Sequence, residues 1–249
     1  MSVADMSSLY TSGEYANKNP SWHVEDSPWK AQQIVRAISM LPRLPQTVCD
    51  IGCGAGEILR QLELQLPSET GIQFVGYDIS PQALALARAR QSLRTEFVLG
   101  DARADDRHFD LCLCIDVFEH VEDCFGFLRD IRRKADYFIF HIPIDLNCES
   151  LLRNFVMQNR QLWGHVHYFT RDTALALLRE CGYTTLGQFY VPMPAGLRTA
   201  ITTRIRGMIF RVLPNFSPIL LNGFHVMAIA STGSDAVDLR PASDAPGVS

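Results

Sequence analysis

The chain has 249 residues, of which 47% are hydrophobic and 20% charged, and its formal net charge is -4 at pH 7. This length can bury a full core as one α/β domain with a small cap. The acidic balance leaves no basic surface for a nucleic-acid backbone, which excludes long RNA or DNA as the expected substrate. Seven scattered cysteines, without a signal peptide or an apolar run of about 18 residues, predict a cytoplasmic protein with reduced thiols.

The N-terminal part of the chain is predicted to form an arm followed by one helix. Residues 1 to about 20 are rich in Ser, Asn, Tyr and Gly and show no hydrophobic periodicity. Ser27 as N-cap, Pro28 in the first turn and the apolar positions that follow predict a helix from about 28 to 41.

A glycine-rich loop follows the first predicted strand. The apolar run 48–51 meets Gly52, Gly54 and Gly56 and then a helical pattern, which predicts a strand, a tight loop and a helix N-terminus. Alternating glycines permit positive φ and bring backbone N–H groups close to a ligand. A dinucleotide site would use the spacing G-x-G-x-x-G and would avoid an acid such as Asp50 beside its phosphates. The loop therefore favours a nucleotide-like ligand with a cationic end.

The pattern D-x-G-x-G-x-G after an apolar strand resembles the first motif of class I S-adenosylmethionine-dependent methyltransferases. The resemblance implies a doubly wound, Rossmann-like α/β sheet of seven strands with the last strand antiparallel. It also implies S-adenosylmethionine as the cofactor, bound by Asp50 and the loop glycines. The expected organisation is an arm and cap helix over 1–45, a methyltransferase domain over 46–230 and a disordered tail over 231–249.

Two further acids end the next predicted strands. One strand–helix–strand unit separates Asp50 from Asp78. Parallel pairing of the two strands would therefore place Asp78 beside the glycine loop. A carboxylate there can accept hydrogen bonds from both ribose hydroxyls, and the neighbouring Ile79 is also expected to contact the cofactor. In the family, an acid at the third strand end binds adenine. The resemblance therefore assigns Asp101 to the exocyclic amine and the N–H of Ala102 to a ring nitrogen.

A fourth predicted strand, 109–115, is nearly continuous in apolar residues, as a strand covered on both faces should be. It leads into Asp116, Glu119 and His120, a block that resembles the fourth motif of many class I methyltransferases and adds Asp116 to the cofactor contacts. The D-x-x-E-H spacing also resembles the E-x-x-E-H metal cluster of ubiquinone-pathway and small-RNA methyltransferases. The latter family adds a histidine that His165 matches, which implies a site for Mg²⁺ or a similar divalent ion.

The resemblance to the metal families is incomplete. Asp116 replaces a glutamate, and His167 stands where the small-RNA methyltransferases have an aromatic residue. Without a metal, His165 or His167 would act as the base or orient the acceptor, while His120 would lie near the cofactor. A purely structural role for all three histidines is the remaining alternative.

Aromatic residues in the arm are candidates for the acceptor pocket. In class I methyltransferases a leading segment often folds over the cofactor and acceptor, so Trp22, His23 and Trp29 would bind the acceptor. The alternative is that the tryptophans only anchor the arm on the core.

An insertion of about thirty residues, 191–222, precedes the last predicted strand. Its stretch 198–213 interleaves arginines with apolar residues in a basic amphipathic pattern. The pattern predicts a lid or interface helix over the acceptor site, or contact with an anionic membrane or a lipid-linked acceptor.

Taken together, these patterns predict a methyltransferase that acts on a small-molecule acceptor, with a preference for a hydroxyl of a sugar, glycan intermediate or secondary metabolite. A non-catalytic S-adenosylmethionine-binding module and an NAD-dependent oxidoreductase are the alternatives. The sequence predicts no oligomeric state.

Overall fold

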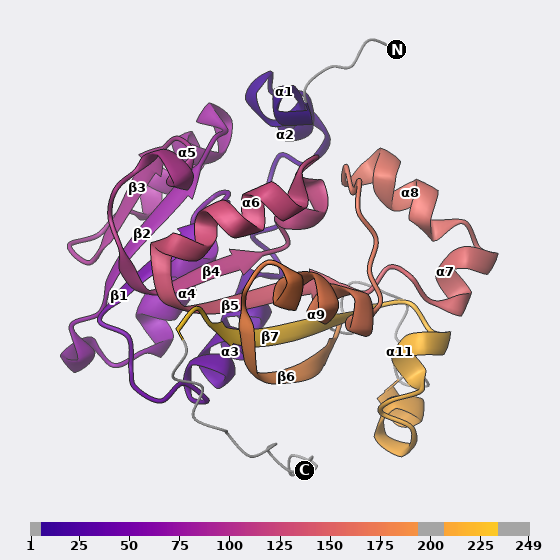
Figure 1. The fold of residues 1–249 in the computed structure, drawn as a ribbon. Helices are drawn as coiled ribbons and strands as arrows, with labels where there is room; N and C mark the ends of the chain where they lie inside the picture. The colour runs from indigo at the N-terminus through magenta and orange to yellow at the C-terminus, as the bar shows by residue number, and fades with distance from the viewer. Residues whose placement is uncertain (1–5, 194–206, 234–249) are drawn as a thin grey trace.

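A seven-stranded sheet in the order β3-β2-β1-β4-β5-β7-β6 forms the centre of the molecule (Figure 1). The computed structural model describes residues 6–193 and 207–233. The strands are β1 (Thr47–Ile51), β2 (Gln73–Asp78), β3 (Thr95–Leu99), β4 (Phe109–Ile115), β5 (Ala135–Pro143), β6 (Thr184–Pro192) and β7 (Phe224–Ser231). The first five strands pair in parallel, and β7 runs antiparallel to both β5 and β6. The predicted fold class is confirmed.

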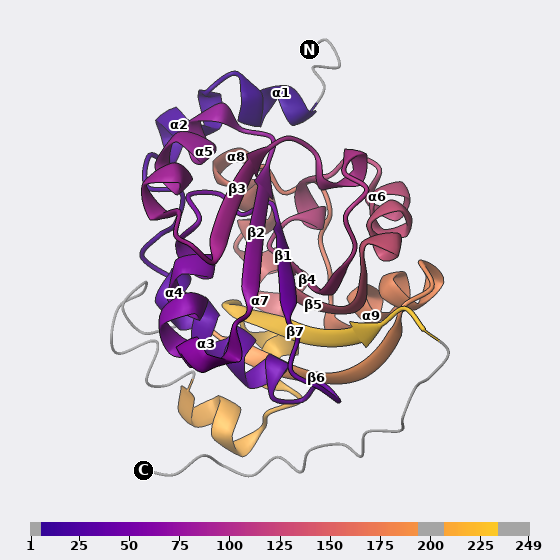
Figure 2. The same cartoon turned by 90° about the vertical axis from the view of Figure 1, so that its left-hand side faces the viewer.

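Helices cover both faces of the sheet (Figure 2). One face carries α3 (Ser27–Ile38), α4 (Glu57–Gln65) and α5 (Pro81–Ala87), and the other carries α6 (Cys124–Ile131) and α9 (Arg171–Glu180). Leu59 and Leu62 of α4 are fully buried in the first core, as are Leu128 of α6 and Leu178 of α9 in the second. Because both faces are covered, β4 can be apolar along nearly its whole length.

Short 3-10 turns link several of these elements. They are η1 (Ser68–Thr70), η2 (Arg88–Arg90), η3 (Ala102–Ala104), η4 (Phe118–His120) and η5 (Arg132–Lys134). The turns η3 and η4 follow the ends of β3 and β4, so they bring the residues predicted to bind ligands to one edge of the sheet.

The N-terminal arm contains two helices that the sequence did not predict, α1 (Met6–Thr11) and α2 (Glu14–Lys18). Helices this short show no periodicity and depend on packing for their stability. The next helix, α3, begins at Ser27 with Asp26 as its N-cap, and it ends at Ile38, earlier than predicted. The predicted end, about residue 41, is thus three residues late, and helix boundaries predicted from sequence commonly differ by about two to four residues.

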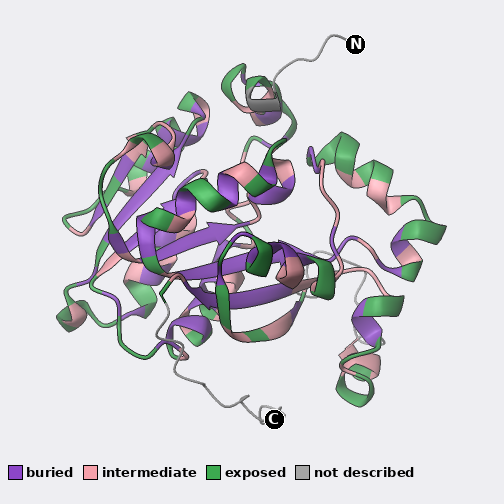
Figure 3. Cartoon of the chain, viewed as in Figure 1, coloured by how far each residue is buried: buried purple, intermediate pink, exposed green. Residues whose placement is uncertain are grey.

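Three short helices form a separate group at the carboxyl edge of the sheet (Figure 1). They are α7 (Cys148–Leu152) and α8 (Phe155–Leu162), which follow β5, and α11 (Ser217–Leu220), which precedes β7; residues 207–212 are also helical. Figure 3 shows that this group is largely exposed, whereas the inner strands β1, β4, β5 and β7 are buried.

Two sequence predictions extend beyond the described residues. Residues 194–206 of the expected lid-like insertion, and 234–249 of the expected disordered tail, lie outside them, so the domain limits stay predictions. In the part of the chain that is described, no helix combines the length and hydropathy needed to cross a bilayer.

Candidate active site

A cavity of about 880 Å³ lies at the carboxyl ends of the parallel strands. Its walls include the glycine loop after β1, the ends of β2 and β4, the turn after β3, the N-terminal arm and part of α8. Ligands of open α/β sheets bind at this edge, and the volume suits a nucleotide-sized molecule together with a small second ligand.

The glycine loop has the backbone conformation that its sequence predicts. Gly52, Gly54 and Gly56 adopt φ values of 75°, 55° and 74°, all in the left-handed region. A Cβ atom at Gly52 would lie 2.8 Å from the Val117 side chain, and one at Gly56 would lie 2.5 Å from Phe97. Backbone conformation and packing therefore both require glycine at these positions.

Asp78 lies beside the glycine loop, as the spacing predicts. Its carboxylate accepts hydrogen bonds from the backbone N–H groups of Gly54 and Ser80, both at 2.8 Å. Burial raises the pKa of Asp78, although these N–H groups act in the opposite direction. The carboxylate thus holds the loop against the end of β2 and also lines the cavity.

Asp50 is buried in β1, with 1% of its surface exposed. Within the described residues, neither of its carboxylate oxygens has a hydrogen-bond partner. Burial and the neighbouring charge of Asp78 raise the pKa of Asp50 to about 8. An isolated buried acid is costly, and a cationic ligand group would offset that cost. Its neighbours Ile51 and Gly52 line the cavity but Asp50 itself does not, so its contact with the ammonium of S-adenosylmethionine stays a prediction.

Asp101 caps the turn after β3. It accepts hydrogen bonds from the backbone N–H and the Nε of Arg103, both at 2.8 Å. Burial raises the pKa of Asp101, but Arg103 outweighs this effect and holds it below the usual value. Asp101, Ala102 and Ile79 all line the cavity, next to the loop and Asp78. Each carboxylate oxygen has two lone pairs, so Asp101 can accept a ligand amine while it binds Arg103.

Asp116 lies at the end of β4 with a φ of 54°, which few non-glycine residues adopt. One of its oxygens is 2.7 Å from Nδ1 of His141 and the other is 2.9 Å from Nζ of Lys30. Burial raises the pKa of Asp116, but His141 and Lys30 outweigh it and hold it well below the usual range. Asp116 is therefore ionised, and both of its oxygens are engaged.

His141 and His225 form a stacked pair behind Asp116. Their ring centroids are 4.4 Å apart and their planes differ by 19°. Trp29 packs edge-on against both rings, at 5.8 and 6.2 Å, and is not among the residues that line the cavity. Burial and His141 lower the pKa of His225 well below its usual value. The imidazole of His225 therefore lines the cavity in its neutral form.

A second acid–histidine group contains Glu119, His120 and His165, which offer ligand atoms within 4.8 Å of one another. Glu119 is fully buried, and among the described residues neither its carboxylate oxygens nor Nδ1 of His120 has a hydrogen-bond partner. Burial raises the pKa of Glu119 well above its usual range. Burial and His165 lower the pKa of His120 to about 3, which keeps this imidazole neutral.

Asp145 fixes the orientation of His165. Its Oδ2 is 2.6 Å from Nδ1 of His165, and its Oδ1 accepts a hydrogen bond of 2.8 Å from Asn159. A carboxylate that holds one nitrogen of a histidine leaves the other nitrogen for a ligand. The structure thus brings three of the four predicted metal ligands together, while Asp116 belongs to the group with His141 and His225.

His167 has a different environment from the other two candidate catalytic histidines. Its Nε2 donates to the backbone carbonyls of Val121 and Glu122, at 2.9 and 3.1 Å. It is not among the residues that line the cavity, unlike His120 and His165. We therefore leave His167 out of the proposed catalytic set.

The N-terminal arm lies over the cavity and supplies aromatic side chains to it. Trp22 and His23 line the cavity, together with Tyr10 and Tyr15 of the unpredicted helices. The hydroxyl of Tyr15 is 3.0 Å from Nε2 of His23, whose ring packs edge-on against Trp163 at 5.0 Å. The contact between His23 and Trp163 thus connects the N-terminal arm to the C-terminal end of α8.

Sequence reasoning missed several other residues of the site. Asp145 follows β5 by two residues and so repeats the pattern of an acid at a strand end, which could have revealed it. Lys30, His141 and His225 lie in predicted elements but give no local signal, because only the tertiary fold brings them to Asp116.

The sequence matches the model of a known protein family. A family model described as a methyltransferase domain matches residues 24–188, which include the glycine loop and the strand ends described above.

Curated relatives share shorter segments. The chain is 34% identical over 99 residues to norajmaline N-methyltransferase of Rauvolfia serpentina, a match that covers 36% of this chain and 32% of the relative. It is 27% identical over 114 residues to the ubiquinone biosynthesis O-methyltransferase of Nitrosospira multiformis, covering 42% and 46%. The chain thus spans less than half the length of these curated relatives.

Solved structures share the whole fold at low sequence identity. Magnesium protoporphyrin IX methyltransferase from Synechocystis, with bound S-adenosylmethionine, aligns with a TM-score of 0.59 at 13% identity, over 94% of this chain and 100% of that one. The plantazolicin methyltransferase BpumL aligns with a TM-score of 0.58 at 15% identity, over 91% and 93%.

Proposed function

The chain belongs to the methyltransferase-domain family, and we propose that it transfers a methyl group to a hydroxyl of a small polar molecule. Membership makes it an S-adenosylmethionine-dependent methyltransferase, which removes the NAD-dependent alternative. The proposed acceptors are sugars, glycan intermediates and secondary metabolites.

The strand order gives the direction in which the cofactor would lie. Asp101 at β3 would bind the adenine, Asp78 at β2 the ribose, and Asp50 of β1 the ammonium. Because the strands follow the order β3-β2-β1-β4, the sulfonium end would point toward β4 and the acceptor would lie beyond it. The bound cofactor supplies an activated methyl group, so the protein has mainly to align the acceptor.

The observation that carries the hydroxyl assignment is the buried Glu119, which has no hydrogen-bond partner among the described residues, beside His120 and His165 at this acceptor end. A hydroxyl must lose its proton during methylation, and an oriented imidazole or carboxylate can take it. His165 would take the proton on Nε2, since Asp145 holds Nδ1. The aromatic side chains of the arm would exclude water from the reacting groups.

The same three residues fit a divalent metal ion. Glu119 offers a carboxylate without a hydrogen-bond partner in the described residues, His120 is neutral, and Asp145 supports His165 from behind. As the alternative form of this site, we propose that Glu119, His120 and His165 hold such an ion, which would lower the pKa of the acceptor hydroxyl. Nε2 of His165 would then be a metal ligand and would not act as the base.

Two measurements test the proposed function. Calorimetric titration with S-adenosylhomocysteine should give one-to-one binding in the micromolar range. Purified enzyme, S-adenosylmethionine and a panel of hydroxylated sugars and phenols should then give O-methyl products by mass spectrometry, with and without Mg²⁺. Binding accompanied by transfer only to amines would contradict the hydroxyl assignment. The same assay with the Glu119→Gln variant should show a loss of turnover without a loss of S-adenosylhomocysteine affinity.

A further inference from the structure

An exposed apolar surface lies beside the cavity on one side of the molecule. Eleven of the eighteen exposed large apolar side chains in the described residues lie within 151–163 and 208–220, which we call the apolar face. Leu152 of α7 is 87% exposed, Val212 is 73% exposed and Phe216 is 61% exposed. Soluble proteins rarely expose apolar side chains in such a concentration unless the surface binds something.

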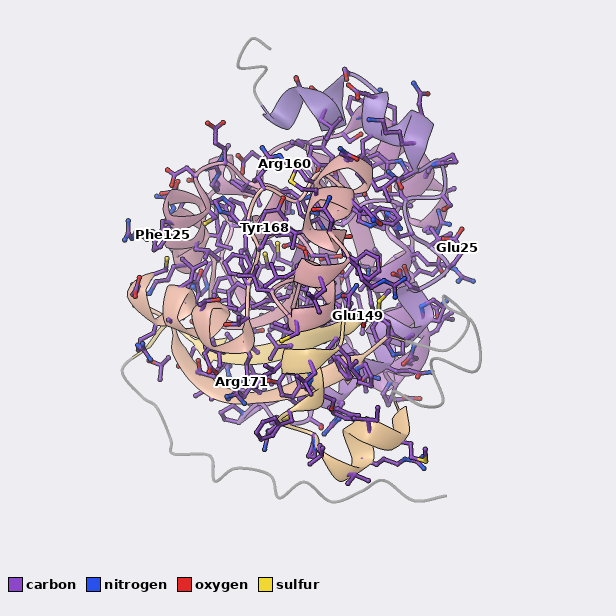
Figure 4. All side chains as sticks on the ribbon, turned by 90° about the vertical axis from the view of Figure 1, so that its right-hand side faces the viewer. Glu25, Phe125, Glu149, Arg160, Tyr168 and Arg171 are labelled. Carbon is purple, nitrogen blue, oxygen red and sulfur yellow. The ribbon has the colours of Figure 1, made fainter. Side chains whose placement is uncertain are left out.

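The two stretches of the apolar face lie side by side although they are far apart in the sequence. The N–H of Asn222, just after α11, donates to the carboxylate of Glu149 in α7 at 3.1 Å. Helices α7, α8 and α11 occupy the same side in Figure 1, and Figure 4 looks onto that side, with Glu149 and Arg160 labelled. The apolar side chains therefore belong to one surface.

The charge on this side is positive, in contrast to the chain as a whole. Residues 147–163 and 207–223 contain Arg153, Arg160 and Arg211 but a single acid, Glu149, whose carboxylate is largely buried and pairs with Arg153 at 3.0 Å. The whole chain carries a net charge of -4. A positive apolar surface on an acidic protein complements an anionic lipid surface.

The composition of the face also favours lipid over a protein partner. Seven of its eleven exposed apolar side chains are leucine, isoleucine or valine, whereas leucine and valine are under-represented among the residues that dominate binding at protein interfaces. Aliphatic side chains on short exposed helices, flanked by arginines, are typical of segments that lie in a membrane interface.

The apolar face is continuous with the cavity. Asn159 and Trp163 of the α8 region line the cavity, as do Met193 and Asn222 beside the second stretch. Trp163 is itself partly exposed, and tryptophan is common at the boundary between lipid and water. A molecule anchored in a bilayer could reach the cavity without leaving the surface.

We propose that the apolar face docks the enzyme on an anionic lipid surface and that the acceptor is a polar headgroup carried on a lipid anchor. The lipid-anchored acceptor rests on the proposed function, whereas the docking itself does not. The apolar side chains enter the interface, and Arg160 and Arg211 contact anionic headgroups. The polar part of the acceptor then reaches Glu119, His120 and His165.

Vesicle binding tests the docking without an identified acceptor. Full-length protein is sedimented with phosphatidylcholine vesicles, with and without about one-third phosphatidylglycerol. The wild type should bind the anionic vesicles and bind the neutral ones at least about tenfold more weakly. The Leu152→Ser, Phe216→Ser double variant should lower the partition coefficient by roughly tenfold or more. The Arg160→Gln, Arg211→Gln double variant should lower it on anionic vesicles only.

Matched variants at equally exposed positions elsewhere serve as controls. Leu64→Ser with Leu93→Ser removes apolar surface near β3, and Arg88→Gln removes a charge there; both should leave vesicle binding unchanged. All variants should keep the wild-type affinity for S-adenosylhomocysteine, which separates docking from the cofactor site.

Three outcomes would overturn the proposal. They are no sedimentation with anionic vesicles, binding that the apolar-face variants do not weaken, and a dimer that Leu152→Ser and Phe216→Ser dissociate while vesicles are ignored. Such a dimer would show that the apolar face binds a second copy of the chain. Failure to bind S-adenosylhomocysteine would instead reject the proposed function, and vesicle binding would still be measurable.

Discussion

The ammonium of Lys30 lies 2.9 Å from the carboxylate of Asp116, so a salt bridge links helix α3 to the end of β4. The same ammonium is 3.1 Å from Asp26, and the Lys30 and Asp116 side chains are 12% and 22% exposed. Burial lowers the pKa of Lys30, but the two carboxylates outweigh it and raise it above the usual value. One cation therefore balances two acids at the wall of the cavity.

We expect the Lys30→Met variant to lose about 3 kcal/mol of unfolding free energy, because Asp116 would keep its charge without its cation. Urea denaturation at pH 7 measures the loss. Lys18→Met is the matched control, since the exposed pair of Lys18 with Glu14 should contribute less than about 0.5 kcal/mol. Equal losses in the two variants would show that the buried salt bridge has no special role.

Cofactor binding should release a proton from Asp50. With a pKa of about 8, this carboxyl is mostly protonated at pH 7, and a cationic ammonium beside it would favour the ionised form. Affinity for S-adenosylhomocysteine should therefore rise from about pH 6 and level off above the pKa. Calorimetry in buffers of different ionisation enthalpy detects the proton. In Asp50→Asn the pH dependence and the proton release should both disappear; if they persist, another group is responsible.

The Asp78→Ala variant should weaken S-adenosylhomocysteine binding by roughly 1.5–3 kcal/mol, the value of hydrogen bonds to a charged group. The variant loses the proposed ribose acceptor and also the acceptor that holds Gly54. Asp105→Ala is the control, because Asp105 binds Tyr77 and Arg107 and does not line the cavity. Unchanged affinity in Asp78→Ala would refute the ribose assignment.

The metal proposal predicts one Mn²⁺ ion per chain in the wild type. Glu119→Gln should abolish binding, and Asp145→Asn should weaken it by about 10- to 100-fold because His165 loses its support. Glu69→Gln, on the surface turn η1, should bind as the wild type does. Electron paramagnetic resonance of free Mn²⁺ gives the stoichiometry. If Glu119→Gln binds Mn²⁺ normally, the ion lies elsewhere.

The positions of the strand-end acids could be predicted because they depend on local pattern and parallel topology. Asp50 is the last residue but one of β1, Asp78 ends β2 and Asp101 follows β3, and parallel strands joined by helices must place these ends at one edge. The glycine loop was predictable for a similar reason, since all three of its alternating glycines adopt positive φ and a Cβ atom at Gly52 or Gly56 would clash with a packed side chain.

The group that Asp116 forms with His141 and His225 could not be predicted in the same way. His141 lies in β5 and His225 in β7, and they meet only because β7 returns antiparallel after the long insertion. Lys30 reaches Asp116 from a helix whose sequence pattern identifies its buried face but not the direction of its polar side chains. Tyr10 and Tyr15 lie on helices of six and five residues, too short for any periodicity.

The aromatic arm above the cavity has a consequence for how acceptor choice can change. Tyr10, Tyr15, Trp22 and His23 all precede residue 24, where the match to the family model begins, whereas the glycine loop and the strand-end acids lie within it. The wall that we propose for the cofactor thus lies within the family match, and part of the remaining wall comes from a stretch of chain that precedes it. With the proposed acceptor role of the arm, we expect that exchange of that stretch between relatives changes the acceptor while the methyl donor stays the same.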